Sequence, residues 1–359
     1  MKNLPKFSKG EWAELLVLIK IILQQNIVLY NEKLQTTNKI FEVLSIHSKQ
    51  NVIIQLYDNI LTIRVNDVIT VMEKIVNLVT PSDYELLFNE IFNNQDKTFT
   101  PANIPVNIQN KLLQFIDLKT SSTIKSDILL DVKNIDILEQ KLTSGFSIKS
   151  YIGGLPTFLN ASSGTNFIYK VGGDTKNLSE LVINSIDTKS KIRDRINRID
   201  SLGLKLEFYK TEKNEMFHNL NMIDSKIAFF IAEILLKFYQ GYNNSIKKYI
   251  VTESNIFSDN DIKACKLKSF LRAFALGAFP SKLWNGVETS HGLIILKKSG
   301  EVGALHILYS RDLENYLLNN SCFDTPSSTR HQFGGIYQDQ NEYFIKLNLQ
   351  IRIQQKHTI

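Results

Sequence analysis

The chain has 359 residues, of which 43% are hydrophobic and 22% are charged. This is the composition of a globular protein with one large or two medium domains. Its 42 Lys and Arg against 36 Asp and Glu give a formal net charge of +6, which favours polyanionic partners. Cys265 and Cys322 lack the spacing of a zinc site and favour a reducing compartment. The apolar run near the N-terminus is broken by Lys20 and is too short to span a bilayer, so we expect a cytoplasmic protein without a membrane partner.

The first part of the chain shows a helical pattern and then a strand pattern. Apolar residues at helical spacing predict a helix over residues 9–31, in which Glu11 complements the helix dipole. Glu14 follows three residues later and lies near Glu11 on the helix surface. The alternating residues 50–75, with a central Asp-Asn, predict a β-hairpin, although their last part also fits the start of a helix. Residues 81–92 carry the start signals of a further helix.

Residues 125–166 contain two short apolar runs that predict neighbouring strands. Asp127 and Asp131 are four apart in the first run, so in a strand both side chains leave the same face. Ser147 and Lys149 share a face of the second run in the same way. Carboxylates that hold a hard cation, beside a lysine at a developing anion, are the groups that metal-dependent phosphodiester cleavage needs. On spacing alone, a strand-end acid and a solvated lysine are the more frequent explanation.

The second half changes from helices back to strands. Residues 165–171 predict a third strand, and residues 176–250 are predicted to be mainly helical. Basic residues within 189–198 indicate either a phosphate-facing helix or a solvated helix face, and the interleaved acids favour the solvated face. Two apolar runs joined by residues 299–301 predict a second hairpin. Residues 342–353 alternate with period two, which predicts a strand with one buried face and one face able to meet DNA. The second face consists of Phe344, Lys346, Asn348, Gln350 and Arg352.

Several segments carry a family resemblance from end to end of the chain. They are KGEWAEL (9–15), KSDI (125–128), GFSIKSYIGGLPTFLNASSGTNFIYKV (145–171), FHNLNMIDS (217–225), KSFLRAFALGAFPSKLWNG (268–286), and TRHQFGGIY with KLNLQIRI (within 329–353). In this combination they resemble the HpaII family of type II restriction endonucleases. The resemblance implies an α/β (α+β) fold of the PD-(D/E)xK nuclease type, a mixed sheet flanked by helices. We expect a catalytic core in residues 1–175, a mainly helical region in 176–265, and a C-terminal region in 266–359 with a hairpin and a DNA-recognition strand.

The resemblance also implies roles for the acids and the lysine. Asp127 matches the family's first acid and implies a metal ligand, and Lys149 matches its catalytic lysine. The position two residues before the lysine usually holds an acid, but here it is Ser147. The second metal ligand is therefore open between Glu14, on the first helix, and Asp131. The implied cofactor is Mg²⁺, for which Mn²⁺ is able to substitute.

The implied activity is sequence-specific, Mg²⁺-dependent hydrolysis of double-stranded DNA at a short site, and the family includes enzymes for CCGG. Many such enzymes act as homodimers, and a cognate methyltransferase is expected in the same restriction-modification system. Two alternatives stay open: a catalytically impaired DNA-binding protein, which Ser147 motivates, and a structure-selective repair or recombination nuclease. The side chains expected to contact DNA are Lys125, Asn160, Ser162, Asn166, Arg330, His331, Gln350 and Arg352.

Overall fold

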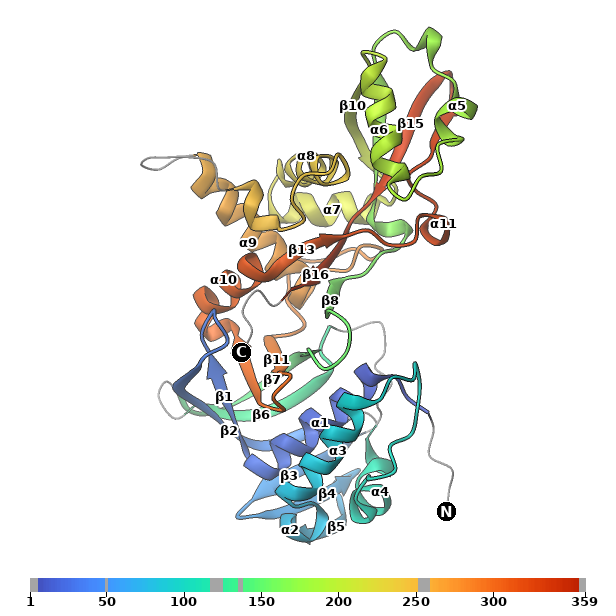
Figure 1. Cartoon of the computed structure of the whole chain (residues 1–359). Coiled ribbons are helices and arrows are strands. Elements are labelled where there is room, and N and C mark those ends of the chain that lie inside the picture. The colour runs from blue at the N-terminus through green and yellow to red at the C-terminus, as the bar shows by residue number, and fades with distance from the viewer. Residues whose placement is uncertain (1–5, 49–50, 117–124, 135–137, 251–258, 355–359) are drawn as a thin grey trace. The chain divides into compact units, whose positions relative to one another are not determined.

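The computed structural model describes residues 6–48, 51–116, 125–134, 138–250 and 259–354 (Figure 1). Contacts within the chain define two compact units, each assembled from two separate segments. Unit 1 contains Met1–Pro156 and Glu288–Tyr316, and unit 2 contains Thr157–Val287 and Leu317–Ile359. The expected division into three consecutive regions stays a prediction. In the ranges just given, no helix is long and apolar enough to cross a membrane.

A nine-stranded mixed sheet forms the centre of unit 1. Its strands are β1 (Asn26–Tyr30), β2 (Thr36–Ser48), β3 (Val52–Tyr57), β4 (Ile60–Val65), β5 (Val68–Lys74), β6 (Ile128–Asn134), β7 (Leu138–Ser150), β11 (Gly292–Leu296) and β12 (Val302–His306). Their order is β1-β12-β11-β7-β6-β2-β3-β4-β5, and β1 also pairs with β2, so six strands close into a ring. The pairs β1–β12 and β7–β11 are parallel. The long strand β2 permits the closure, because it pairs with β1 along one part and with β3 along another.

Helix α1 (Lys9–Gln24) packs on this sheet. Ser8 caps it and Glu11 completes a capping box, which confirms the N-terminal role expected for Glu11. The helix contacts β1, β7 and β11 and also α3 (Figure 1), which explains why nine of its side chains are buried. The other helices of unit 1 are α2 (Ile75–Leu78), α3 (Pro81–Asn93), α4 (Val106–Lys111), and the 3-10 helices η1 (Leu113–Phe115) and η5 (Ile307–Tyr309).

The predicted end of the first helix is wrong. The helix stops at Gln24, Gln25 takes a left-handed conformation with φ 54°, and residues 26–30 form β1. A short apolar run such as this one fits either a buried helix or a buried strand by periodicity alone. The predicted hairpins are confirmed: Asp58 and Asn59 turn between β3 and β4 with positive φ, and β11 pairs antiparallel with β12.

Unit 2 contains two small antiparallel sheets. Its strands are β8 (Thr157–Leu159), β9 (Asn166–Gly172), β10 (Lys205–Thr211), β13 (Ser321–Asp324), β14 (Ile336–Asp339), β15 (Glu342–Asn348) and β16 (Gln350–Ile353). One sheet has the order β10-β9-β15-β14 and the other β13-β16-β8. Strand β9 confirms the predicted third strand. Strand β10 lies within the stretch that was expected to be mainly helical.

Helices surround these two sheets. They are α5 (Glu180–Asn184), α6 (Lys191–Ser201), α7 (Asn214–Ile223), α8 (Ile227–Tyr239), α9 (Asp259–Leu276) and α11 (Ser328–His331), with η2 (Ser163–Thr165), η3 (Thr175–Asn177) and η4 (Ile246–Tyr249). Helix α10 (Ser310–Asn320) runs from the last segment of unit 1 into unit 2. Together with the sheet of unit 1, these elements make the fold mixed α/β, as expected.

Candidate active site

The paired strands β6 and β7 hold Asp127 in a fixed position. Its backbone N–H donates a hydrogen bond of 2.8 Å to the carbonyl of Phe146. Its carboxylate oxygen Oδ2 accepts hydrogen bonds from the Ser147 hydroxyl at 3.0 Å and from the Ile148 backbone N–H at 2.7 Å. The other oxygen, Oδ1, accepts no hydrogen bond from the residues that the structure describes. One oxygen therefore orients the carboxylate, and the other is available to a ligand.

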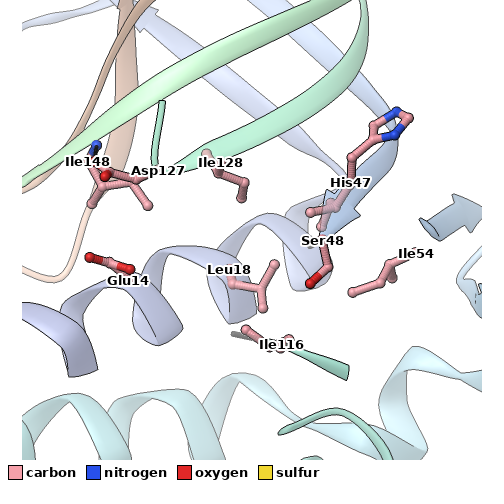
Figure 2. Close-up of a pocket in the computed structure, with 10 residues that line it drawn as sticks. Glu14, Leu18, His47, Ser48, Ile54, Ile116, Asp127, Ile128 and Ile148 are labelled. Atoms are coloured by element: carbon pink, nitrogen blue, oxygen red, sulfur yellow. Dashed lines mark hydrogen bonds between the residues drawn. The ribbon is translucent and has the colours of Figure 1, made fainter. Parts of the chain in front are cut away.

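Glu14 reaches the same pocket from helix α1. Figure 2 shows Glu14 on the helix side and Asp127 on the sheet side of this pocket. Most of the remaining lining is apolar and includes Leu18, Ile128 and Ile148. Glu14 is half-buried on a helix whose neighbouring side chains are fully buried. Apolar walls lower the local dielectric constant and strengthen the attraction of the two carboxylates for a cation.

Two lysines lie in the field of these carboxylates. Burial lowers the pKa of Lys149, while the negative charges of Asp127 and Glu14 act in the opposite direction. Burial also lowers the pKa of Lys125 to about 8, with a contribution from the charge of Lys149 that Asp127 opposes. Because each lysine senses its neighbours, the two lysines and two carboxylates form one electrostatically coupled cluster.

Asp131 belongs to a different network, although it was expected to share a face with Asp127. It is buried, and its Oδ2 accepts hydrogen bonds from Ser45 and, at 2.8 Å, His47, while Lys141 lies 2.7 Å away. Its Oδ1 accepts a hydrogen bond of 2.6 Å from Thr143. Burial alone would raise the pKa of this carboxyl. The hydrogen bonds from Lys141, Ser45, Thr143 and His47 together outweigh burial, so the pKa is well below its usual value. These donors come from β2 and β7, so Asp131 ties three strands together.

A hard cation fits the pair formed by Asp127 and Glu14. Among the residues that the structure describes, no group of three or more His, Cys, Asp or Glu side chains is arranged to hold a metal. Mg²⁺ does not require such a group, because it usually keeps several waters and takes only one or two protein carboxylates beside the substrate's phosphate oxygens. The accessible Oδ1 of Asp127 and the Glu14 carboxylate across the pocket match that requirement.

The first group of expected DNA contacts lies around η2 and is only partly exposed. Asn160 is exposed and Ser162 is half-buried. Asn166 is buried, donates to Glu212 at 2.6 Å, and accepts a hydrogen bond of 2.6 Å from Asn348. Its side chain therefore makes hydrogen bonds in the interior of unit 2.

The second group of expected DNA contacts also divides by exposure. Arg330 is exposed and His331 is half-buried on α11. Gln350 is 8% exposed, with an Oε1 that has no partner among the described residues. Arg352 is half-buried and donates to Asp324.

The predicted exposed row on the last strand is wrong. Phe344 and Asn348 are buried, and Lys346 pairs with Glu212 at 2.9 Å. The run divides at Leu349 into β15 and β16, and each half lies between two other strands of its sheet. Lys346, Asn348 and Arg352 on this run therefore bond to protein groups, whereas Oε1 of Gln350 is buried without a partner among the described residues.

Sequence reasoning missed the partners that hold the two acids. The Ile148 N–H that orients Asp127 is a backbone group, which no residue pattern reveals. The polar alternation of Ser45 and His47 on β2 is a signal for the Asp131 network, but it becomes informative only once β2 is known to pair with β6.

Two carboxylates line one pocket, and their charges act on the nearby Lys149. These are the groups that metal-dependent nucleases use to hydrolyse phosphodiester bonds. The HpaII restriction endonuclease family model matches residues 8–353. The type II restriction enzyme HpaII of Haemophilus parainfluenzae is 34% identical over 370 aligned positions, which cover 96% of this chain and 98% of the relative. The chain therefore belongs to the HpaII restriction endonuclease family. No solved structure matches it. It is a type II restriction enzyme, a DNA endonuclease, and the expected family and enzyme class are confirmed.

Proposed function

We propose that this endonuclease hydrolyses DNA with Mg²⁺ held by Asp127 and Glu14, and with Lys149 as the catalytic cation. The observation that carries the proposal is that Asp127, with one carboxylate oxygen held by Ser147 and the Ile148 N–H, lines the same pocket as Glu14. The charges of both carboxylates also act on Lys149. We also propose that the sheet and helix α1 of unit 1 are the PD-(D/E)xK core that the family resemblance implies. Mn²⁺ is expected to substitute for Mg²⁺, because it prefers the same oxygen ligands.

Each residue of this cluster has a separate role. Ser147 and the Ile148 N–H hold Oδ2 of Asp127, so that the carboxylate would hold the cation without reorganisation. Lys149 holds a positive charge where the phosphate becomes more negative in the transition state. Mg²⁺, when bound, supplies an activated water and neutralises charge on the phosphate. Asp131 is not needed as a ligand, because its oxygens are already engaged.

The proposed DNA contacts divide into two sets. Lys125, Asn160, Ser162, Arg330 and His331 contact DNA, because they are exposed or half-buried. Asn166 and Gln350 are buried and Arg352 donates to Asp324, so these three residues support the same segments from within unit 2. The recognition site is a short palindrome such as CCGG, cut by a homodimer in the cytoplasm, where the cognate methyltransferase protects the host DNA. A two-fold axis would place one active site at each strand of a palindrome.

Cleavage of defined DNA tests the proposal. Purified protein is incubated with a plasmid of known sequence in Mg²⁺, in Mn²⁺ and in EDTA, and the fragments are separated on a gel. A fixed set of fragments in either metal, absent in EDTA, is the expected result, and sequencing of the fragment ends gives the site. Equal cleavage in EDTA would contradict the metal mechanism. Intact DNA in both metals, from folded protein that binds DNA, would indicate an impaired site.

A further inference from the structure

Unit 2 contains a groove that the candidate active site does not use. Three segments form its walls: residues 189–193 at the start of α6, residues 238–242 at the end of α8, and residues 325–328 before α11. The groove has a volume of about 520 Å³ and opens to solvent, which is within the usual range for ligand-binding clefts. All of its lining belongs to unit 2, so one compact unit defines it.

One wall of the groove is positively charged. Lys189, Lys191 and Arg193 contribute to it, and no Asp or Glu is among the described residues that line the groove. Lys191 pairs with Asp187 at 2.9 Å, and Arg193 lies 3.7 Å from Asp194. Asp187 is 77% exposed, and ion pairs of this kind contribute little in water. The cations can therefore exchange these partners for a phosphate, which accepts stronger charge-assisted hydrogen bonds.

The rest of the lining suits a chain that alternates charged and apolar groups. Thr325, Ser327 and Ser328 present hydroxyl-bearing side chains, whereas Ile192 and Phe238 are apolar. A sugar–phosphate backbone has this alternation, because phosphates carry the charge and deoxyribose rings lie between them. Direct contacts between proteins and DNA go largely to such phosphate and sugar groups.

Gly241 allows the basic wall to pack closely. It has φ +99°, and a Cβ at this position would lie 3.0 Å from Cδ of Arg193. The aliphatic part of Arg193 therefore packs on the glycine backbone at the end of α8. This contact fixes the base of the Arg193 side chain at the groove and reduces the entropy that its guanidinium loses on binding.

We propose that this groove binds the sugar–phosphate backbone of the DNA substrate and contributes affinity without reading sequence. The proposal rests on the proposed function, since it takes double-stranded DNA as the ligand. Continuity supports it: Ser328, in the groove wall, is the first residue of α11, which carries the exposed Arg330 already proposed to contact DNA. Backbone contacts of this kind position a protein on the duplex, while base contacts elsewhere determine the site.

The salt dependence of binding tests the groove. Fluorescence anisotropy of a labelled duplex, in EDTA to prevent cleavage, is measured over a series of salt concentrations. The test protein carries Lys189→Gln, Lys191→Gln and Arg193→Gln, and the control carries Lys176→Gln, Lys205→Gln and Lys210→Gln. The control lysines are exposed residues of unit 2 outside the groove. Both triple variants lose the same charge, so a difference between them reports position alone.

The slope of log K against log [salt] is negative, and we expect its magnitude to decrease by about 2 to 3 in the groove variant, because each lost phosphate contact removes about 0.9 from that magnitude. The control should retain the parent slope. Equal changes in both variants, or an unchanged slope in the groove variant, would overturn the proposal. Thermal unfolding of each variant confirms that the protein is folded.

A second variant tests the opposite wall without removing a cation. Thr325→Asp places a negative charge among the hydroxyl side chains, and it should weaken binding several-fold by repelling phosphate. Unchanged affinity would exclude this wall from the DNA contact.

Cleavage and binding separate this proposal from the proposed function. Suppose that the parent protein gives no discrete fragments, but that DNA binding becomes less dependent on salt in the groove variant and not in the control. The proposed function is then wrong, and the proposed role of the groove in DNA binding is supported. If the parent cleaves at a fixed site and the groove variant binds as the parent does, the groove fails and the function stands. With both correct, the groove variant should give the parent's fragments at low salt and lose activity earlier as salt rises.

Discussion

The hydroxyl of Ser147 donates a 3.0 Å hydrogen bond to Oδ2 of Asp127. In the PD-(D/E)xK pattern that the family resemblance implies, an acid occupies this position, whereas here a serine hydroxyl orients the carboxylate of Asp127. A serine that holds the carboxylate is compatible with activity, provided that a second carboxylate comes from elsewhere. Glu14 is placed to supply it.

Ser147→Ala should slow cleavage modestly. It removes one hydrogen bond to the carboxylate and leaves the one from the Ile148 N–H, so a loss of about 1 kcal/mol, or roughly fivefold in kcat, is expected. Single-turnover cleavage of a plasmid measures it, and Ser147→Thr, which retains the hydroxyl, should recover part of the rate. Complete inactivation by Ser147→Ala would mean that the hydroxyl does more than orient Asp127.

Lys149→Ala should reduce kcat by about a hundredfold or more, because it removes a preorganised cation from the transition state. Binding of a site-containing duplex in EDTA should change far less than the cleavage rate. Lys149→Arg should not restore the parent rate, since the guanidinium is larger and has a different geometry. An alanine variant that cleaves as fast as the parent would exclude Lys149 from the chemistry.

Glu11 lies on the same helix as Glu14, so its substitution is a control for the substitution of Glu14. Glu14→Gln should abolish the calorimetric signal of Mg²⁺ binding in the presence of DNA and lower cleavage strongly, because a neutral amide is a poor ligand for a hard cation. Glu11→Gln should leave both nearly unchanged, because glutamine also completes a capping box. Equal effects of the two substitutions would indicate damage to the helix and would remove the support for Glu14 as a ligand.

Asp131→Asn should destabilise the protein by roughly 3 kcal/mol, because an amide is a weaker acceptor than a carboxylate for the buried hydrogen bonds from Ser45, His47 and Thr143. Glu233→Gln removes the acid of the exposed Lys237–Glu233 pair and should cost less than about 1 kcal/mol. Urea unfolding at neutral pH compares the two. Normal stability with lost Mg²⁺ binding in Asp131→Asn would instead assign Asp131 to the metal site.

His306 should make stability depend on pH below its ordinary pKa. Burial, with help from His291, lowers its pKa from 6.5 to about 3. Between these values the unfolded chain binds a proton that the folded chain does not, so the free energy of unfolding decreases as pH falls from 6.5. Urea unfolding between pH 6.5 and 3.8 covers the part of this window above the ordinary Asp pKa. His306→Gln should flatten the slope there, and an unchanged slope would assign it to other groups.

The sequence was informative where local pattern and family resemblance agreed. Asp127 directly precedes β6 and Lys149 lies on the adjacent strand β7, and the charge of Asp127 acts on Lys149. The turn at Asp58 and Asn59 was predictable because residues of this type tolerate the positive φ that it needs. In both cases the interacting residues are close in sequence or belong to consecutive strands.

The features that the sequence did not reveal depend on contacts between segments that are far apart in the chain. Ser45 reaches Asp131 from 86 residues away, and spacing within either segment carries no information about that contact. The polar row ending in Gln350 and Arg352 was misjudged for the same reason. An alternating pattern shows which residues share a face, but other parts of the chain decide whether that face meets water.

The anchoring of Asp127 bears on the choice of inactive protein for crystallisation with DNA. The Ile148 N–H lies just beyond the point where the paired residues of β6 and β7 end, and it donates to the Asp127 carboxylate. That carboxylate is thus a structural cap on a strand pair as well as the proposed metal ligand. A neutral substitution there would disturb the geometry that the complex is meant to reveal. Lys149 is the better residue to replace, because its removal is expected to slow cleavage about a hundredfold or more while leaving this strand end intact.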